Sequence, residues 1–245
     1  MNDFFQPYNL NKSKIPKIEQ RIGLPLKNTD TTSETGNISV YFRDLDQKLA
    51  QYISQAEAVV GAVAWLTHEH ILEELAKKKL VAIVVQKDSF SEKTKNLYEK
   101  LPPFKWQAMF SGIMDNISSY DDSHKNWKAI RCVGTYKKSP RPLMHNKFLI
   151  FCTIQYMDFI DDTLMASGIK ESLCYVEVPF LYPYAVWTGS FNISKNAVNS
   201  LENALYITDP KIVNAYYDEW CQIQALSEEL NWKNDCMTPQ WRIED

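Results

Sequence analysis

Apolar side chains recur along the chain with two different periods. Leu45, Leu49 and Ile53 are four residues apart, which predicts an amphipathic helix, whereas residues 58–66 (AVVGAVAWL) are apolar almost throughout, as in a strand buried on both faces. These two patterns predict helices at residues 38–56, 68–79, 87–101 and 210–230, and strands at 58–66, 80–86, 129–134, 143–154, 185–194 and 204–209.

The order of these elements predicts an α/β fold. A strand at 58–66, a helix at 68–79 and a strand at 80–86 match two parallel strands joined by a right-handed crossover. We therefore expect a mixed, largely parallel sheet flanked by helices. Residues 1–37 are polar and turn-rich, and we expect them to form an N-terminal arm or irregular leader ahead of one folded domain over residues 38–245.

Composition and charge narrow the class of protein. The chain has 27 basic and 30 acidic residues, so any contact with nucleic acid must come from a local basic patch. Its five cysteines are odd in number and none forms a Cys-x-x-Cys pair, which favours free thiols over a disulfide framework or a zinc ribbon. The N-terminus lacks the pattern of a secretory signal, and no apolar run is long enough to span a bilayer. We expect a cytoplasmic protein without a membrane partner.

Five polar side chains in the second half of the chain form a set that suits phosphoryl chemistry. His145 and Lys147 are two residues apart in a predicted strand, which places them on one face, and Ser190 and Asn192 have the same spacing after the next predicted strand. A histidine is a nucleophile and proton carrier near neutral pH, while a lysine, a hydroxyl and an amide can hold phosphoryl oxygens. Glu202 follows ten residues after Asn192, and a carboxylate can fix the tautomer of a histidine.

The motifs that contain these residues resemble those of the phospholipase D superfamily. His145-Asn146-Lys147 matches its His-x-Lys motif, Gly189-Ser190-Phe191-Asn192 matches its Gly-Ser-x-Asn motif, and an acidic residue, Glu202, follows. The resemblance covers roughly residues 38–228 in order and looks like the bacterial nuclease branch. It implies a phospholipase D-like sandwich over residues 38–245 and a phosphodiesterase that uses no metal and no cofactor.

The resemblance also implies a mechanism and a partner. His145 of one copy would attack phosphorus and form a phosphohistidine, while His145 of a second copy would protonate the leaving oxygen and then activate water. Lys147, Ser190 and Asn192 of both copies would hold the phosphoryl oxygens, and Glu202 would orient His145. The superfamily uses two motifs per active site, and this chain has one His-x-Lys among its four histidines. The expected partner is therefore a second copy of the chain.

Two features depart from the family pattern. Cys152 stands where the motif has an aspartate, a residue generally regarded as structural in the family. In addition, an insertion at about 153–184 separates the two motifs, where the family has a tight turn. A long loop in a compact domain is often functional, and this one could serve as a lid, a dimer contact or a substrate gate.

The leading interpretation is an intracellular nuclease, an endonuclease that binds DNA in preference to RNA, acts in restriction or defence, and has a regulatory protein as a further partner. One alternative is a phosphodiesterase that acts on lipids or other small phosphodiesters, and another is a degenerate, dimeric binding module. Taken singly, His145 fits a structural histidine, Asn192 a helix cap and Glu202 a solvated charge. His68 and His70 fit a surface role at the start of a helix better than a metal pair.

Overall fold

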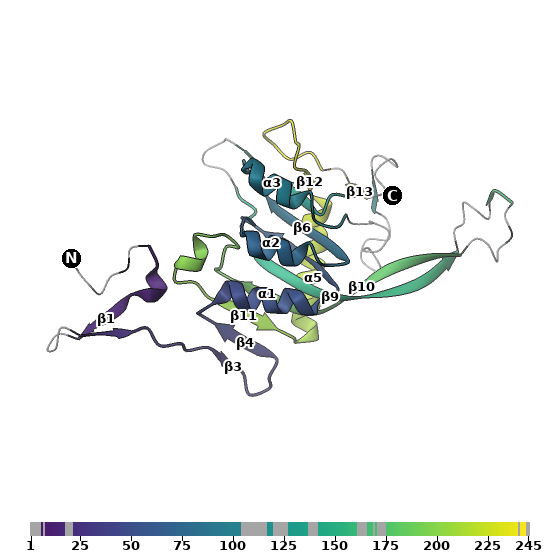
Figure 1. Ribbon diagram of the computed structural model, residues 1–245. Coiled ribbons are helices and arrows are strands. Elements are labelled where there is room, and N and C mark those ends of the chain that lie inside the picture. Colours follow the sequence, from purple (N-terminus) through teal and green to yellow (C-terminus); the bar gives the residue numbers. More distant parts are fainter. Residues whose placement is uncertain are drawn as a thin grey trace.

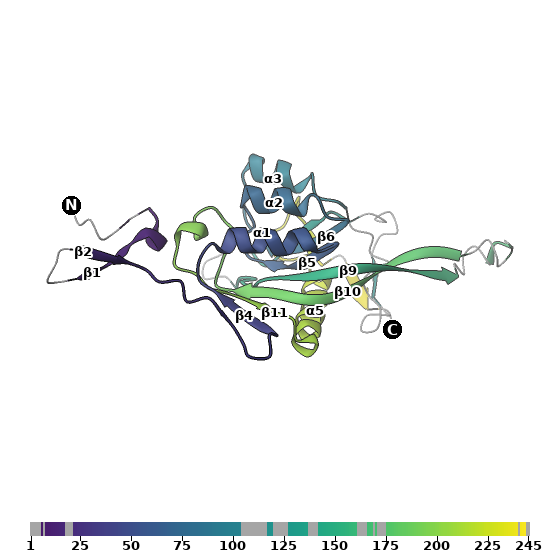
Figure 2. The ribbon, with the colours of Figure 1, turned by 60° about the horizontal axis from the view of Figure 1, so that its bottom comes forward.

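The computed structural model describes residues 6, 8–17, 22–103, 117–119, 127–136, 142–160, 166–168, 170, 175–239 and 241–243. In this part of the chain, one large sheet lies between two layers of helices (Figure 1). Helices α1 (Leu45–Gln55), α2 (Glu69–Leu75) and α3 (Glu92–Tyr98) cover one face, and α5 (Pro210–Ala225) covers the other, as Figure 2 shows. The predicted α/β sandwich is confirmed.

The large sheet has nine strands in the order β12-β8-β6-β5-β9-β10-β11-β4-β3. Their bounds are β3 (Thr31–Thr32), β4 (Ile38–Tyr41), β5 (Ala58–Val63), β6 (Leu80–Gln86), β8 (Ile130–Val133), β9 (Lys147–Ile160), β10 (Tyr175–Gly189), β11 (Ala204–Ile207) and β12 (Glu228–Glu229). Two small sheets pair β1 (Lys14–Lys17) with β2 (Ile22–Pro25), and β7 (Ile117–Ser119) with β13 (Trp241–Ile243). Short 3-10 helices lie at η1 (Leu10–Lys12) and η4 (Ala197–Asn199).

The strand directions correct one expectation. The crossover from β5 through α2 to β6 is parallel, as the sequence predicts, and β6 also pairs in parallel with β8. All other ladders of the large sheet are antiparallel, so the sheet is mixed but not largely parallel. One reason is that β10 and β11 are joined without a long helix, with only the three-residue η4 between them, whereas parallel neighbours need a longer crossover.

A second correction concerns residues 38–56, which we expected to be one helix. Residues 38–41 instead form β4, which pairs with β11, and the helix begins only at Leu45. In α1, Leu49 and Ile53 are fully buried against the sheet, so the four-residue spacing identifies the face that packs. The β-branched residues of Ile38-Ser39-Val40 favour a strand once β11 offers a neighbour.

The core has two parts, one on each face of the sheet. In β5 the side chains of Val59 and Val63 pack toward α1 and α2, whereas those of Ala58, Val60 and Ala62 pack toward α5. All six residues of β5 are buried, because the strand is central and covered on both faces. This rigid centre supports the ends of the neighbouring strands.

Residues 153–160 and 175–184 of the insertion between the two motifs continue β9 and β10, where we expected a loop. β9 pairs with β5 only as far as Cys152, and Ile154 and Leu181 still pack near α5, but residues 155–160 and 175–180 pair only with each other. We call these two segments the ribbon. It extends beyond the body in both views (Figures 1 and 2). Six residues of a strand span about 20 Å. Residues 161–165, 169 and 171–174 of the insertion lie outside the described part.

The ribbon leaves the sheet at the end opposite to the motifs. β9 begins at Lys147 and runs away from it, and β10 returns from the ribbon to end at Gly189. Of the three roles considered for the insertion, the ribbon's direction is therefore incompatible with a lid or gate over the same chain's motifs.

Four cysteines of the described residues, Cys132, Cys152, Cys221 and Cys236, are free thiols, as expected, and Cys174 lies outside those residues. Burial raises the pKa of the Cys132 and Cys221 thiols to about 12, so neither is a ready nucleophile. Within the same described ranges, no helix combines the length and apolar character needed to cross a membrane.

Shortening the ribbon should leave the body intact. Replacing residues 156–179 by Asn-Gly joins Gln155 to Phe180, which already face each other across the ladder, through a turn that suits two antiparallel strands. We expect the melting temperature, measured by circular dichroism, to stay within about 5 °C of the wild type, because the described residues removed have no strand partner in the body. Loss of a cooperative transition would show instead that the ribbon is part of the fold.

Candidate active site

The segment that carries His145 is fixed by two hydrogen bonds, one to a side chain of β6 and one to the backbone that follows β5. The Met144 amide donates to Gln86 Oε1 at 2.7 Å, and the Ala64 amide donates to the Asn146 carbonyl at 2.8 Å. His145 itself is exposed and precedes β9, whose first residue is Lys147. The two side chains are thus brought together by this anchored segment, and not by alternation along a strand as we expected.

Gln86 is a supporting residue that the sequence analysis did not single out. It ends β6 and is fully buried, and besides accepting from Met144 it donates through Nε2 to the carbonyls of Lys87 at 3.1 Å and Thr135 at 3.3 Å. The available signal was a lone amide at the end of the apolar run LVAIVVQ, because a buried amide needs partners.

Lys147 and His145 are in direct contact. Lys147 Nζ lies 3.2 Å from the ring nitrogens of His145 and donates to the His145 carbonyl at 2.9 Å. The edge of the Trp65 ring system meets the imidazole with centroids 5.4 Å apart and planes at 80°. Partial burial lowers the pKa of Lys147, and the nearby Glu202 carboxylate opposes this shift. The arrangement combines an imidazole with a cation at one exposed edge.

The second motif is held by the residue pair that continues the β10–β11 ladder. The Ser190 amide donates to the carbonyl and to the side-chain Oδ1 of Asn203, both at 3.1 Å, and the Asn203 amide donates to Ser190 Oγ at 3.1 Å. A Cβ at Gly189 would lie 2.3 Å from the Asn203 carbonyl oxygen, so this position requires glycine. Asn203 is thus a second supporting residue. Its role depends on strand register, and strand register could not be predicted from the sequence.

Glu202 contacts a different partner from the one expected. Its Oε2 accepts a short hydrogen bond from Ser190 Oγ, and its hydrogen bond does not go to the imidazole of His145. The cause is the pairing of Ser190 with Asn203, which sets the neighbouring carboxylate beside the serine hydroxyl. In this structure Glu202 orients Ser190 and acts on Lys147 through charge, and the predicted Glu202–His145 contact is absent.

Asn192 is half-buried, and its Oδ1 is buried without a hydrogen-bond partner. The next residue, Ile193, accepts through its carbonyl from the Thr67 amide at 2.8 Å and the His68 amide at 3.1 Å. This contact brings the second motif against the segment that follows β5, just as Ala64 holds the first motif.

Cys152 lies on the other side of the sheet from Lys147. The two residues are five apart in β9, so their side chains point to opposite faces, and Cys152 is fully buried in the core cluster that faces α5. Desolvation raises the pKa of its thiol. The missing motif aspartate therefore removes no group from the face that carries Lys147.

His68 lies at the start of a helix, as expected, but it is partly buried and not simply at the surface. It immediately precedes α2, its Nε2 is 3.8 Å from an Asp46 carboxylate oxygen, and partial burial lowers its pKa. Across the residues whose positions are described, no cluster of three or more histidine, cysteine, aspartate or glutamate side chains is arranged to hold a metal ion.

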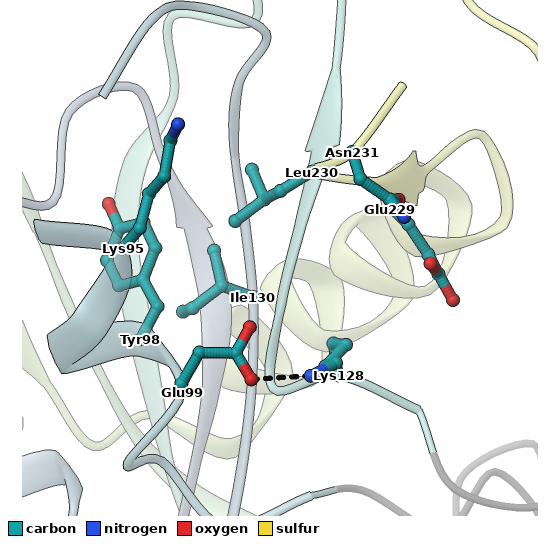
Figure 3. A pocket seen from close by; sticks show the side chains of 8 residues that line it. All are labelled: Lys95, Tyr98, Glu99, Lys128, Ile130, Glu229, Leu230 and Asn231. Atoms are coloured by element: carbon teal, nitrogen blue, oxygen red, sulfur yellow. Dashed lines mark hydrogen bonds and ion pairs between the residues drawn. The ribbon is translucent and has the colours of Figure 1, made fainter. Parts of the chain in front are cut away.

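A cavity of about 290 Å³ lies elsewhere, between α3, β8 and residues 229–231 (Figure 3). Its lining includes Lys95, Tyr98 and Ile130, and the Lys128–Glu99 ion pair crosses one side. None of the five motif side chains lines this cavity, so the candidate site is a separate, open edge of the molecule.

Comparison with known proteins gives the following similarities. No family model matches the chain. Over 239 residues, 95% of this chain and 77% of the other, the sequence is 29% identical to "Uncharacterized protein L381" of Acanthamoeba polyphaga mimivirus.

Three solved structures are similar in fold. Nuc from Salmonella typhimurium, itself a phospholipase D family member, aligns with a TM-score of 0.45 and 15% identity over 78% of this chain and 95% of its own. NucT from Helicobacter pylori aligns with a TM-score of 0.44 and 19% identity, over 76% of this chain and 96% of its own. The third is TrmBL2, an archaeal chromatin protein whose structure is described as showing a novel mode of DNA binding. It aligns with a TM-score of 0.39 and 11% identity, over 81% of this chain and 56% of its own. All three TM-scores are below 0.5, so the similarity concerns part of the architecture and says nothing of the side chains of the candidate site.

Replacing Gln86 should destabilise the protein through the His145 segment. Gln86→Met keeps the side-chain volume but leaves the Met144 amide without its acceptor, which should cost about 1–3 kcal/mol in urea-induced unfolding. The matched control is Gln51→Met at an exposed position of α1, which should change stability by less than about 0.5 kcal/mol. Equal effects of the two substitutions would contradict the anchoring role.

Removing the charge of Glu202 should lower the pKa of Lys147 further. The carboxylate favours the ammonium form, so Glu202→Gln leaves the desolvation of Lys147 unopposed, and the titration midpoint of its ¹³Cε resonance should move to lower pH. Ser190→Ala keeps the carboxylate and should produce a smaller shift. A midpoint that stays in place or rises in Glu202→Gln would show that the two groups do not interact.

Proposed function

We propose that the chain is a phosphodiesterase of the phospholipase D superfamily that cleaves nucleic acid without a metal ion. The observation that carries the proposal is the contact of Lys147 Nζ with the exposed imidazole of His145, with Glu202 acting on Lys147 through its charge and accepting a hydrogen bond from Ser190. A nucleophile beside a fixed cation suits attack on a phosphodiester, whose oxygens gain negative charge in the transition state.

The proposed reaction has two steps. A ring nitrogen of His145 attacks phosphorus and forms a P–N bond as the P–O bond to the leaving group breaks, and His145 of a second copy donates the proton that the leaving oxygen takes up. Water then attacks the phosphohistidine, gives its proton to that second histidine, and frees His145 of the first copy. Each histidine returns to its starting protonation state at the end of the cycle.

The other side chains divide the task of binding the phosphoryl oxygens. Lys147 supplies positive charge, the Asn192 amide donates from its Nδ2, and Ser190 presents a hydroxyl whose orientation Glu202 fixes. This assignment changes the role of Glu202 from orienting His145 to orienting Ser190 and keeping Lys147 protonated.

The proposed reaction requires a homodimer, because it uses two histidines and one chain supplies one of them. The exposure of His145 supports it, since a second copy can approach that edge. The position of Cys152 on the opposite face weighs against the degenerate binding module, since the substitution leaves the motif side chains unaffected. We further propose an endonuclease that prefers DNA, is located in the cytoplasm and acts in restriction or defence under a regulatory protein.

Hydrolysis in excess EDTA tests the chemistry. Purified protein should cleave bis(p-nitrophenyl) phosphate and plasmid DNA in EDTA, and His145→Ala should lower both rates by at least about a thousand-fold. The matched control is His70→Ala, an exposed histidine on α2, which should retain wild-type rates. Activity that depends on added metal, or that persists in His145→Ala, would overturn the proposed mechanism.

Subunit mixing tests the shared site. When wild-type protein is exchanged with increasing amounts of His145→Ala, activity per wild-type chain should fall in proportion to the fraction of wild-type partners, because every site needs two histidines. Constant activity per wild-type chain, together with a monomer mass by light scattering, would show that one chain is sufficient.

A further inference from the structure

Residues 6–28, the part of the N-terminal arm that we call the arm below, have a charge opposite to that of the chain as a whole. Between Lys12 and Lys27 the sequence contains five basic residues and one acidic residue, whereas the entire chain has 27 basic and 30 acidic residues. Lys12, Lys14 and Lys27 are exposed. These three exposed lysines therefore provide a local excess of positive charge of the kind that an acidic protein needs in order to bind a polyanion.

The arm is attached to the body beside the candidate active site. Asn11 Nδ2 donates to the carbonyls of Val198 at 3.2 Å and Ser200 at 2.9 Å, in the loop that connects the Gly-Ser-x-Asn motif to Glu202. Both figures show the β1–β2 hairpin standing off the same end of the molecule as the green loop that contains η4, with the ribbon at the other end (Figures 1 and 2).

A second anchor fixes the other end of the arm. The Phe42 amide donates to Asp30 Oδ1 at 2.7 Å, Lys48 Nζ lies 2.9 Å from Asp30 Oδ2, and β3 pairs with β4 in the large sheet. Because the chain is held on both sides of the hairpin, the lysines are presented from a defined position and do not belong to a free tail.

Exposed apolar and aromatic side chains accompany these charges. Tyr8 is 90% exposed, and Ile15 and Leu24, which face each other across the β1–β2 ladder, are 55% and 48% exposed. Single-stranded nucleic acid is commonly bound by this combination, in which lysines contact the phosphates while aromatic faces stack on bases.

We infer that the arm binds the nucleic-acid strand next to the scissile bond, so that the substrate is a polynucleotide and not a small phosphodiester. This inference rests on the proposed function, because it takes the phosphate at His145 as one of a series. A polynucleotide carries further phosphates on each side of that bond, and a basic hairpin beside the Glu202 loop meets them as the strand leaves the site.

Charge removal on the arm tests this inference. Binding of a fluorescent single-stranded DNA oligonucleotide is followed by anisotropy in EDTA, in the His145→Ala background to prevent cleavage, with and without the additional Lys12, Lys14 and Lys27 to Gln substitutions. The dissociation constant should rise at least about tenfold at 0.1 M salt, and the slope of log K against log salt should become shallower by about 2, since each lost phosphate contact contributes about 0.7.

The matched control replaces three exposed lysines on other parts of the body, Lys100, Lys211 and Lys233, and should leave the slope and the affinity unchanged. A second variant, Asn11→Ala, keeps every charge but removes the anchor on Val198 and Ser200, and it should weaken oligonucleotide binding with a smaller change in slope. In the catalytically active background, the arm substitutions should lower kcat/KM for DNA far more than for bis(p-nitrophenyl) phosphate.

The outcomes separate the arm from the chemistry. If the small diester is cleaved through His145 but the arm and control variants bind DNA alike, the inference fails and the proposed function stands. If the arm variant instead loses the dimer by light scattering, or loses binding to anionic phosphatidylserine vesicles with DNA binding intact, the arm contacts a second copy or a membrane, and the inference is overturned. If no diester is cleaved in EDTA, the proposed function itself has failed.

Discussion

Both motifs of the candidate site depend on the segment that follows β5. The Ala64 amide holds the His-x-Lys segment through Asn146, and the Thr67 and His68 amides hold the Gly-Ser-x-Asn loop through Ile193. Trp65, between these two anchors, meets the imidazole of His145 edge-on. Segments separated by more than forty residues are thus bound to one short stretch of backbone. Because β5 is buried on both faces, that stretch has little freedom to move, and the spacing of the two motifs is set by the core.

The core also explains which parts of the fold the sequence could predict. β5 and β6 are recognisable because a central strand is apolar on both faces, and α1 because its buried residues repeat every four positions. β4 could not be separated from the helix after it, since this four-residue strand gains its pairing from β11, about 160 residues away. The insertion was expected to be a loop because of its length, yet β10 continues through Pro179. A proline is tolerated where a strand has one neighbour only, as β10 does along the ribbon.

The same distinction holds within the site. His145, Lys147, Ser190 and Glu202 could be chosen from the sequence because the residue types themselves state the chemistry. The contacts among them could not be predicted, because contacts depend on strand register and on backbone hydrogen bonds. Glu202 contacts Ser190 because Asn203 continues the β10–β11 ladder. Gln86 is likewise visible only once the fold brings Met144 over the end of β6. His145 and Lys147 are neighbours, as the two-residue spacing predicted. The cause is the anchored segment before β9, and not alternation along a strand.

The two appendages of the molecule differ in chemistry as well as position. The arm is basic and is attached beside Glu202, whereas the ribbon segments 155–160 and 175–180 contain Asp158 and Glu177 and no basic residue. A polyanion would be repelled by the ribbon and attracted to the arm, and the two project from opposite ends (Figures 1 and 2). An isolated pair of strands has little stability of its own, and the two ribbon segments have strand partners only in each other. The charge distribution thus distinguishes the end of the sheet that carries the candidate site from the end at which the ribbon projects.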